Sequence, residues 1–462
     1  MTVSVETQCL ILGGGLSGIA AGYWLGDRSG PVLERNPYPG GHIHTWTKHG
    51  FTWDEGPHVQ FGRHPIAQRF FRRLGESNYL ERDAVILNYW RGHWIPHPAQ
   101  VNLFPVPAEQ RRQYVESLLN AKSRSDPGAL DEAANYWDWL IAAYGEEFST
   151  DFPLHYTTKY WSVHPREMST SWLGPRMHLP TRDEIVHGAQ RSLGSGAHYL
   201  NRFIYPTTGG YMRFVDGVID PRKLELSVEV RMIDLNDRII YVDDNRQYSY
   251  TSLINTIPLP EFIRLCVNVP AEVIEATNGL LCSELVLVNV EIPHELSQKF
   301  HWCYVYDEDL LSTRITSYGE LSPANVPAGQ SGLQVEVYGS RRKPFELPVR
   351  QIGETVVSEL RQMGLVDAKA EIRFHTRYTK YANVVFDLNR EVCLDVIWSW
   401  LSDYGLKREA SDLDYSPNWD ALQPEPLGSV MMAGRFAQWN YFWTHDCVLR
   451  AHHLSECLKH NG

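Results

Sequence analysis

The chain has 462 residues, of which 43% are hydrophobic and 21% charged, and its net charge at pH 7 is −12. This length can hold two or three domains, whereas the acidic balance argues against nucleic-acid binding. No apolar run approaches the ~18 residues of a membrane span, and we expect neither a signal peptide nor a membrane span. The seven cysteines are scattered and form no C-x-x-C pair, which favours reduced thiols in a cytoplasmic protein and predicts no metal site.

Residues 9–34 have the pattern of a nucleotide-binding strand, turn, helix and strand. An apolar run, residues 9–12, precedes the glycine-rich turn at 13–18, a helical segment follows, and a second apolar run ends on Glu34. A glycine-rich turn alone is a weak signal, because any tight turn can imitate it. The strand before it, the helix after it and the acid at the expected distance together predict a dinucleotide site.

The three glycines and the glutamate of this unit each have a physical role. Gly13 permits the tight turn, Gly15 lets the backbone approach a pyrophosphate, and Gly18 lets the helix lie close to the strand. The phosphates would lie at the helix N-terminus, where free N–H groups favour anions. Glu34, 21 residues after Gly13, is placed to accept hydrogen bonds from a ribose.

The run Glu34-Arg-Asn-Pro-Tyr-Pro-Gly-Gly41 suggests which dinucleotide binds. It resembles the acid, Arg/Asn-rich turn and Gly-Gly pair of FAD enzymes of the amine-oxidase and glutathione-reductase type. The resemblance implies FAD, with Arg35, Gly40 and Gly41 beside it.

A histidine follows the next strand at a Gly-Pro turn. Two interpretations of His58 are open: a structural histidine, or one that contacts the flavin ring. The run Gly56-Pro-His-Val59 resembles the Gly-Pro/Gly-His-Val/Ile turn of the UDP-galactopyranose mutases, whose histidine lies beside the isoalloxazine. That resemblance favours a place for His58 at the flavin.

Residues 90–102 predict a hairpin that ends in a rigid X-Pro-X-Pro element. The segment is similar to one in the eukaryotic mutases whose Tyr and Gln hold the uracil. Gln100 matches the Gln, whereas His97 replaces the Tyr and Ala99 a Phe. The resemblance implies that His97 and Gln100 bind substrate, but it leaves the nucleobase open.

Residues 109–119 and 129–144 have helical spacing. After them, Trp172-Leu-Gly-Pro-Arg176 resembles the mutase segment whose final arginine contacts the substrate pyrophosphate. Without the family, Arg176 is one surface arginine among many. With it, Arg176 is expected to bind the diphosphate.

From residue 280 the hydrophobic period changes to two, which predicts strands at 285–292 and 333–338 in a separate sheet. Between them, Arg314 matches a second pyrophosphate-binding arginine of the mutases. Two guanidinium groups that converge would form a diphosphate clamp, because guanidinium is always charged and bidentate towards phosphate.

Residues 406–428 are acidic and proline-rich and look like an insertion absent from the usual mutase. The final run to Asp446 resembles the Gly-Arg-Phe/Leu element with which the mutase chain returns to the flavin. It implies that Arg435 and Asp446 lie at the cofactor and Tyr441 at the substrate; the alternative is an aromatic core helix. Tyr381 matches a sugar-binding tyrosine of the family, although the usual proline after it is absent.

We therefore predict an α/β fold with a Rossmann-type FAD-binding domain, an inserted helical part and an antiparallel β-sheet substrate domain. Residues 1–105, 201–280 and 426–462 would form the FAD-binding domain. Residues 106–200 would form the helical part and residues 281–425 the sheet domain.

The resemblance implies an FAD-dependent pyranose/furanose mutase of a nucleoside-diphosphate sugar. In that family reduced flavin attacks the anomeric carbon through N5, so the cofactor is the nucleophile. His58, Arg176 and Arg314 would be the catalytic residues, NAD(P)H is a candidate reductant, and a homo-oligomer is compatible with the chain.

Two alternatives are open. An FAD oxidase or desaturase on the same scaffold would remove hydride from another small molecule, and a neutral substrate would not need two buried arginines. A non-catalytic flavoprotein that senses a nucleotide sugar is the other.

Overall fold

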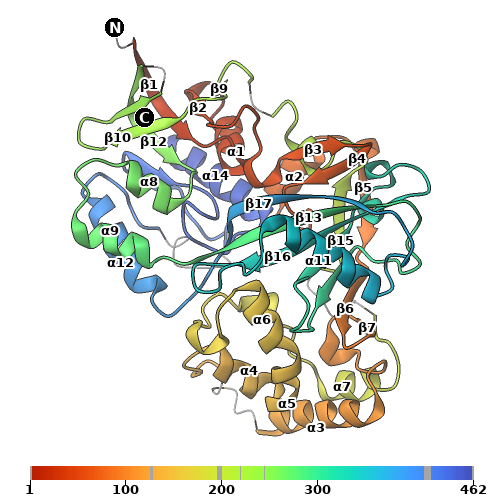
Figure 1. The fold of residues 1–462 in the computed structure, drawn as a ribbon. Helices are drawn as coiled ribbons and strands as arrows, with labels where there is room; N and C mark the ends of the chain where they lie inside the picture. Colours follow the sequence, from red (N-terminus) through yellow and green to blue (C-terminus); the bar gives the residue numbers. More distant parts are fainter. Residues whose placement is uncertain are drawn as a thin grey trace.

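Two seven-stranded sheets and a group of helices make up the structure, a computed structural model (Figure 1). It describes the chain in the ranges 3–124, 128, 130–194, 200–218, 220–243, 245–409 and 418–459.

The first sheet has the strand order β10-β11-β12-β1-β2-β9, and β18 pairs with the last three residues of β12, beyond those that pair with β11. Strand β1 (Val3–Leu12) pairs in parallel with both β2 (Val32–Leu33) and β12 (Arg246–Asn255). The last four residues of β1 are all apolar and buried, as expected of a central parallel strand covered on both faces. The other strands are β9 (Leu224–Glu225), β10 (Val230–Asp234), β11 (Ile239–Val242) and β18 (Val430–Met432).

Helix α1 (Leu16–Leu25) connects β1 to β2 and lies beside the C-terminal helix α14 (Thr444–Lys459) (Figure 1). Together with the returning strands, this arrangement confirms the predicted α/β fold with a Rossmann-type unit. The segments that build it come from the beginning, the middle and the end of the chain.

The second sheet has the order β17-β13-β16-β15-β14-β6-β7. Its bounds are β6 (Ile86–Trp90), β7 (His93–Pro96), β13 (Cys282–Ile292), β14 (Trp302–Val305), β15 (Arg314–Ser317), β16 (Ser331–Gly339) and β17 (Arg373–Val384). The pairs are antiparallel, as predicted, except that β6 runs parallel to β14.

The hairpin β6–β7 is confirmed, but its place differs from the expectation. It precedes residue 105 and was assigned with the FAD-binding segments, whereas it extends the second sheet. The reason is that β15 covers only one edge of β14. The other edge needs a partner strand that satisfies its N–H and C=O groups, and β6 provides it.

The helical part lies at the bottom of Figure 1, in orange and gold, below the second sheet. It consists of α3 (Ala108–Arg124), α4 (Tyr136–Tyr144), α5 (Glu146–Ser149), α6 (His155–Tyr160) and α7 (Arg182–Gly188). Further helices are α2 (Pro65–Arg72), α8 (Leu259–Leu265), α9 (Ala271–Gly279), α10 (Tyr318–Leu321), α11 (Val349–Gln362) and α12 (Arg390–Ser402). There are also two two-stranded antiparallel sheets. One pairs β3 (Thr45–Lys48) with β4 (Phe51–Asp54), and the other pairs β5 (Tyr79–Asp83) with β8 (Arg202–Pro206).

A buried lysine fastens the helical part to the second sheet. The Lys159 ammonium of α6 donates to the carbonyls of Val305 (3.1 Å), Asp307 (2.8 Å) and Ser312 (2.7 Å). The Glu359 carboxylate of α11 accepts from the N–H of Ser312 at 3.0 Å, so the loop between β14 and β15 is held from both sides. This loop leads directly into Arg314.

Among the described residues, no helix is both long and apolar enough to cross a membrane.

Replacing Lys159 by Met should lower the free energy of unfolding by about 3 kcal/mol or more. The substitution keeps the aliphatic stem but leaves three buried carbonyls without their donor, and each such loss costs ~1–3 kcal/mol. Urea unfolding followed by tryptophan fluorescence measures the change. Lys343→Met is the control, because within the described part of the chain the Lys343 ammonium donates to one carbonyl, that of Thr158, at 3.2 Å. Equal losses in the two variants would contradict the fastening role.

Candidate active site

One cavity of about 1060 Å³ extends from the glycine turn of the first sheet to the second sheet and the helical part. That volume is at the upper end of ~300–1,000 Å³ for ligand pockets, so a cofactor and a substrate have room together. The predicted site residues that line it are Gly13, Gly15, Glu34, Arg35, Gly40, Gly41, His58, His97, Gln100, Arg176, Arg314, Tyr381, Arg435 and Tyr441. Gly18 and Asp446 do not line it.

Gly18 acts instead by allowing close packing. A Cβ at this position would lie 1.9 Å from the carbonyl oxygen of Gly13, so any other residue would push α1 away from the end of β1. Gly15 is the N-cap of helix α1 and has no side chain to cover the first N–H groups of the helix. These groups and the helix dipole form an anion site that faces the cavity.

The second glycine turn lies directly against the first. The Gly40 N–H donates to the Gly14 carbonyl at 2.8 Å, and a Cβ at Gly41 would lie 3.2 Å from the Cα of Gly15. Both Gly40 and Gly41 have positive φ, at 111° and 54°, where glycine is favoured. Two backbones without side chains therefore form one narrow cradle, which suits a pyrophosphate.

The Glu34 carboxylate is fixed at the end of β2. Its Oε2 accepts from the N–H of Gly14 at 2.8 Å, and its Oε1 accepts from the N–H of Asn36 at 2.8 Å and from the Asn36 amide at 2.7 Å. A carboxylate has about four acceptor positions, so capacity is left for a ribose hydroxyl. The cradle of the two glycine turns and the Glu34 carboxylate together fit a dinucleotide such as FAD.

His58 is held as a neutral imidazole. Burial, with smaller contributions from the neighbouring His42, Arg314 and Arg435, lowers its pKa to about 3. Its Nδ1 lies 2.9 Å from the Gly56 carbonyl, which in the neutral ring places the proton on Nδ1 and leaves Nε2 as an acceptor. The ring thus lines the cavity in one tautomer.

His42, part of the second glycine turn, was not predicted as a site residue. Its ring packs on Phe436 at 5.1 Å, and burial together with the Arg435 charge lowers its pKa to about 4. The sequence signal was its position directly after the Gly-Gly pair, where the chain must face the cofactor. Two neutral imidazoles and the Arg435 cation therefore lie close together in the cavity.

Two arginines contact the same tyrosine ring. The guanidinium carbons of Arg176 and Arg435 lie 4.8 and 4.6 Å from the ring centroid of Tyr441. Arg176 also lies 4.4 Å from the Trp443 ring and donates to the Tyr441 carbonyl at 3.0 Å, and Arg435 donates to the Asn383 amide oxygen at 2.5 Å. The two cations are therefore positioned before any ligand binds.

Arg314 is already paired with a carboxylate. Its Nη2 donates to Oε1 of Glu336 at 2.8 Å and its Nε donates to the other carboxylate oxygen. Glu336, which is 2% exposed, also accepts from the Tyr338 hydroxyl at 2.8 Å. A phosphate at Arg314 would compete with Glu336, so the predicted clamp is weaker here than at Arg176.

Tyrosines form much of the wall between the second sheet and the helical part. Tyr156 of α6 packs on Tyr304 of β14 at 5.4 Å, and Tyr160 packs on Tyr338 at 4.8 Å. Burial raises the pKa of Tyr160 and Tyr338 well above the usual value, so their hydroxyls stay protonated and can donate. We did not predict this wall, although the four-residue spacing on α6 was a usable signal.

The residues expected at the nucleobase are held by protein contacts. His97 Nδ1 lies 2.9 Å from the Asn88 amide oxygen, and the ring lies 5.0 Å from that of Tyr304. The Gln100 amide donates to the His178 carbonyl at 3.0 Å. Both side chains thus have fixed orientations in the cavity.

Two expected ligand residues have structural contacts instead. The Tyr381 hydroxyl donates to Glu261 of α8, which ties it to the FAD-binding side of the cavity. Asp446 accepts from the N–H of Trp443 at 2.9 Å and from the Trp419 indole at 3.1 Å. Asp446 therefore caps the start of α14, which explains why it does not reach the cavity.

Comparison with known proteins gives one family and several similar folds. The family model of the flavin-containing amine oxidoreductases matches residues 16–451. A reduced UDP-galactopyranose mutase structure matches with a TM-score of 0.85 at 20% identity, over 99% of this chain and 95% of that one.

Two oxidase structures match less closely. A putative protoporphyrinogen oxidase from Exiguobacterium sp. 255-15 has a TM-score of 0.70 at 15% identity, over 99% of both chains. A putrescine oxidase bound to putrescine has a TM-score of 0.63 at 14% identity, over 99% of this chain and 100% of that one. At these identities the matches establish a shared fold.

Gly15→Ala and Gly18→Ala should separate cofactor binding from folding. A Cβ at Gly15 would meet its nearest protein atoms at 3.9 Å, so this variant should keep the thermal stability of the apoprotein yet bind flavin at least about tenfold more weakly. Gly18→Ala should lower both, because its Cβ meets backbone at 1.9 Å. Flavin titration and thermal unfolding of the apoproteins measure the two effects. Unchanged flavin affinity in Gly15→Ala would contradict a pyrophosphate at this turn.

Proposed function

The chain belongs to the flavin-containing amine oxidoreductase family, and from this premise we propose that it is an FAD-dependent mutase. The reaction would interconvert the pyranose and furanose forms of a nucleoside-diphosphate hexose, as the name of UDP-galactopyranose mutase indicates for that protein.

The observation that carries the proposal is the pair of arginines at Tyr441. Arg176 and Arg435 present two fixed cations to a cavity that also contains Arg314. In a protein of net charge −12, such a local concentration of guanidinium groups suits a ligand with several negative charges. The fold is also more similar to that of the mutase than to those of the two oxidases described above.

The chain's own residues would bind and orient the substrate. Arg176 and Arg435 would hold the diphosphate, and the hydroxyls of Tyr160 and Tyr441, 3.5 Å apart, would hydrogen-bond sugar hydroxyls. Neutral His58 offers Nε2 as an acceptor, while the aromatic wall excludes water and strengthens each of these contacts. Reduced flavin, when bound, supplies the nucleophile for exchange at the anomeric carbon, and NAD(P)H is a candidate source of its electrons.

An FAD oxidase is the second candidate, and the Arg314–Glu336 ion pair is the observation that favours it. A paired arginine no longer adds net positive charge for a phosphate, and an aromatic wall that also contains a buried carboxylate, that of Glu336, suits an amine. The proposed location is the cytoplasm, which agrees with seven cysteines that are all free thiols in the structure.

Turnover of a nucleotide sugar should depend on the oxidation state of the flavin. Dithionite-reduced protein should convert UDP-galactose, or a related nucleoside-diphosphate hexose, to its furanose form without net consumption of reductant. The oxidised protein should be inactive. Chromatography of the sugar products together with flavin absorbance measures both. One-for-one reduction of the oxidised flavin by a substrate would place the protein among the oxidases.

Arg176→Ala should weaken binding of a nucleoside diphosphate by roughly 10- to 150-fold, because a charged hydrogen-bonding partner contributes ~1.5–3 kcal/mol. The loss should be similar for the nucleotide sugar, since the contact is to phosphate. Titration of flavin fluorescence measures both ligands. Arg166→Ala is the control, because Arg166 is exposed and packs on Trp137.

Arg314 needs a double substitution, because removing it alone would leave Glu336 buried and unpaired. Arg314→Met with Glu336→Gln should weaken diphosphate binding less than Arg176→Ala does. Unchanged affinity in both the Arg176 variant and the double variant would contradict a diphosphate site.

A further inference from the structure

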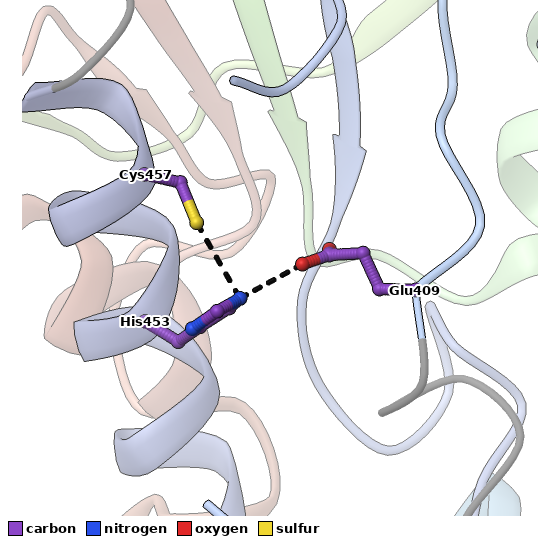
Figure 2. A group of neighbouring side chains, drawn as sticks. All are labelled: Glu409, His453 and Cys457. Atoms are coloured by element: carbon purple, nitrogen blue, oxygen red, sulfur yellow. Dashed lines mark hydrogen bonds and ion pairs between the residues drawn. The ribbon is translucent and has the colours of Figure 1, made fainter. Parts of the chain in front are cut away.

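Three metal-ligating side chains meet outside the cavity, at the C-terminal helix (Figure 2). Glu409 follows α12, while His453 and Cys457 lie four residues apart on α14 and so share one face of that helix. Glu409 Oε1 lies 2.8 Å from His453 Nε2, and Cys457 Sγ lies 3.4 Å from the same nitrogen. Their ligand atoms all lie within 4.8 Å of one another.

Glu409 and Cys457 share a single ring nitrogen, so only one of them can accept its proton. Figure 2 shows both contacts ending on the same nitrogen of His453. If Nε2 carries a proton, that proton points at either Glu409 or Cys457; if it does not, it can accept from the thiol but repels the carboxylate. A catalytic triad is also excluded, because a relay would use the two different nitrogens of the ring. A cation between the three atoms would satisfy all of them at once.

The separation of the His453 and Cys457 ligand atoms suits a small transition-metal ion, whereas Glu409 Oε1, at 2.8 Å from the same nitrogen, would have to move away by about half an ångström. Zinc binds His N at ~2.0–2.1 Å and Cys S at ~2.3 Å, which at tetrahedral angles separates the two ligand atoms by about 3.6 Å. The separation of His453 Nε2 and Cys457 Sγ is 3.4 Å, so binding needs movements of only tenths of an ångström there. Carboxylate, imidazole and thiolate together are a donor set that zinc accepts and that magnesium and calcium do not.

A fourth side chain, that of Arg450, orients the Glu409 carboxylate. Arg450 pairs with Oε2 of Glu409 at 2.5 Å and donates from Nε to the Met432 carbonyl at 3.1 Å. The carboxylate is therefore turned so that its other oxygen, Oε1, faces His453 and Cys457. Contacts of this kind, one step beyond the ligands, commonly fix metal-binding side chains.

We propose that Glu409, His453 and Cys457 form a zinc site, with water in the fourth position. Binding would release the thiol proton, since the thiolate is the ligand. The site would fasten the segment after α12 to α14, whose first turn lines the cavity at Thr444. The proposal differs from the sequence-based expectation that the chain has no metal site.

The test is zinc uptake by the purified flavoprotein. Chelator-treated protein, equilibrated with zinc and dialysed, should retain one zinc ion per chain by elemental analysis. Cys457→Ala and His453→Gln should each lower the affinity by at least about 100-fold in competition with a colorimetric chelator. His452→Gln and Cys266→Ser are matched controls that should keep full uptake, because they change the neighbouring histidine and a distant buried thiol.

A second measurement does not depend on how the variants fold. Zinc-edge X-ray absorption of the wild-type protein should show one sulfur ligand at ~2.3 Å with nitrogen and oxygen ligands at ~2.0 Å. No zinc uptake by the wild type, equal uptake by the Cys457 and His453 variants, or a zinc shell without sulfur would each overturn the proposal. A higher melting temperature with zinc in the wild type alone would support it.

Discussion

The approach of α1 to β1 is the constraint on which the rest of the structure depends. With 1.9 Å between a hypothetical Gly18 Cβ and the Gly13 carbonyl, the helix can start only where the strand ends. That position brings Glu34 to the Gly14 N–H and leaves the second glycine turn room to lie against the first. A single steric requirement therefore sets the start of α1, the position of the Glu34 carboxylate and one end of the cavity.

The other end of the cavity is set by which groups carry charge when buried. His58 and His42 lose their positive charge on burial, whereas Arg176, Arg314 and Arg435 keep theirs because guanidinium is not deprotonated in proteins. Because burial removes the charge of the two histidines, the positive charge of the cavity comes from its arginines. Each arginine is then compensated by neighbours: aromatic rings for Arg176 and Arg435, a carboxylate for Arg314.

Local patterns predicted the fold class, the two glycine turns and the arginines that line the cavity, but not its tyrosine wall. The run from residue 9 to Glu34 and the period-two strands carry their signal within a few residues, so periodicity was sufficient. The hairpin β6–β7 was misplaced because its pairing with β14 joins residues more than two hundred positions apart, and no local pattern encodes such a partner. The pattern at Asp446 is ambiguous for a related reason: a carboxylate at a helix start suits a cap as well as a ligand, and in the structure it accepts from the Trp443 N–H.

The Arg314–Glu336 pair shows that the pairing register of β15 and β16 must be known before the charge that Arg314 brings to the cavity can be interpreted. The two residues are direct partners across β15 and β16, 22 positions apart in the chain, so they become neighbours only when the strands pair in this register. Once paired and buried, neither can be removed alone at low cost. A diphosphate that reached Arg314 would have to supply hydrogen bonds as good as those of Glu336, whereas an amine could use Glu336 itself. Of the two proposed chemistries, mutase and oxidase, each would therefore require a different partner for Arg314 when substrate binds.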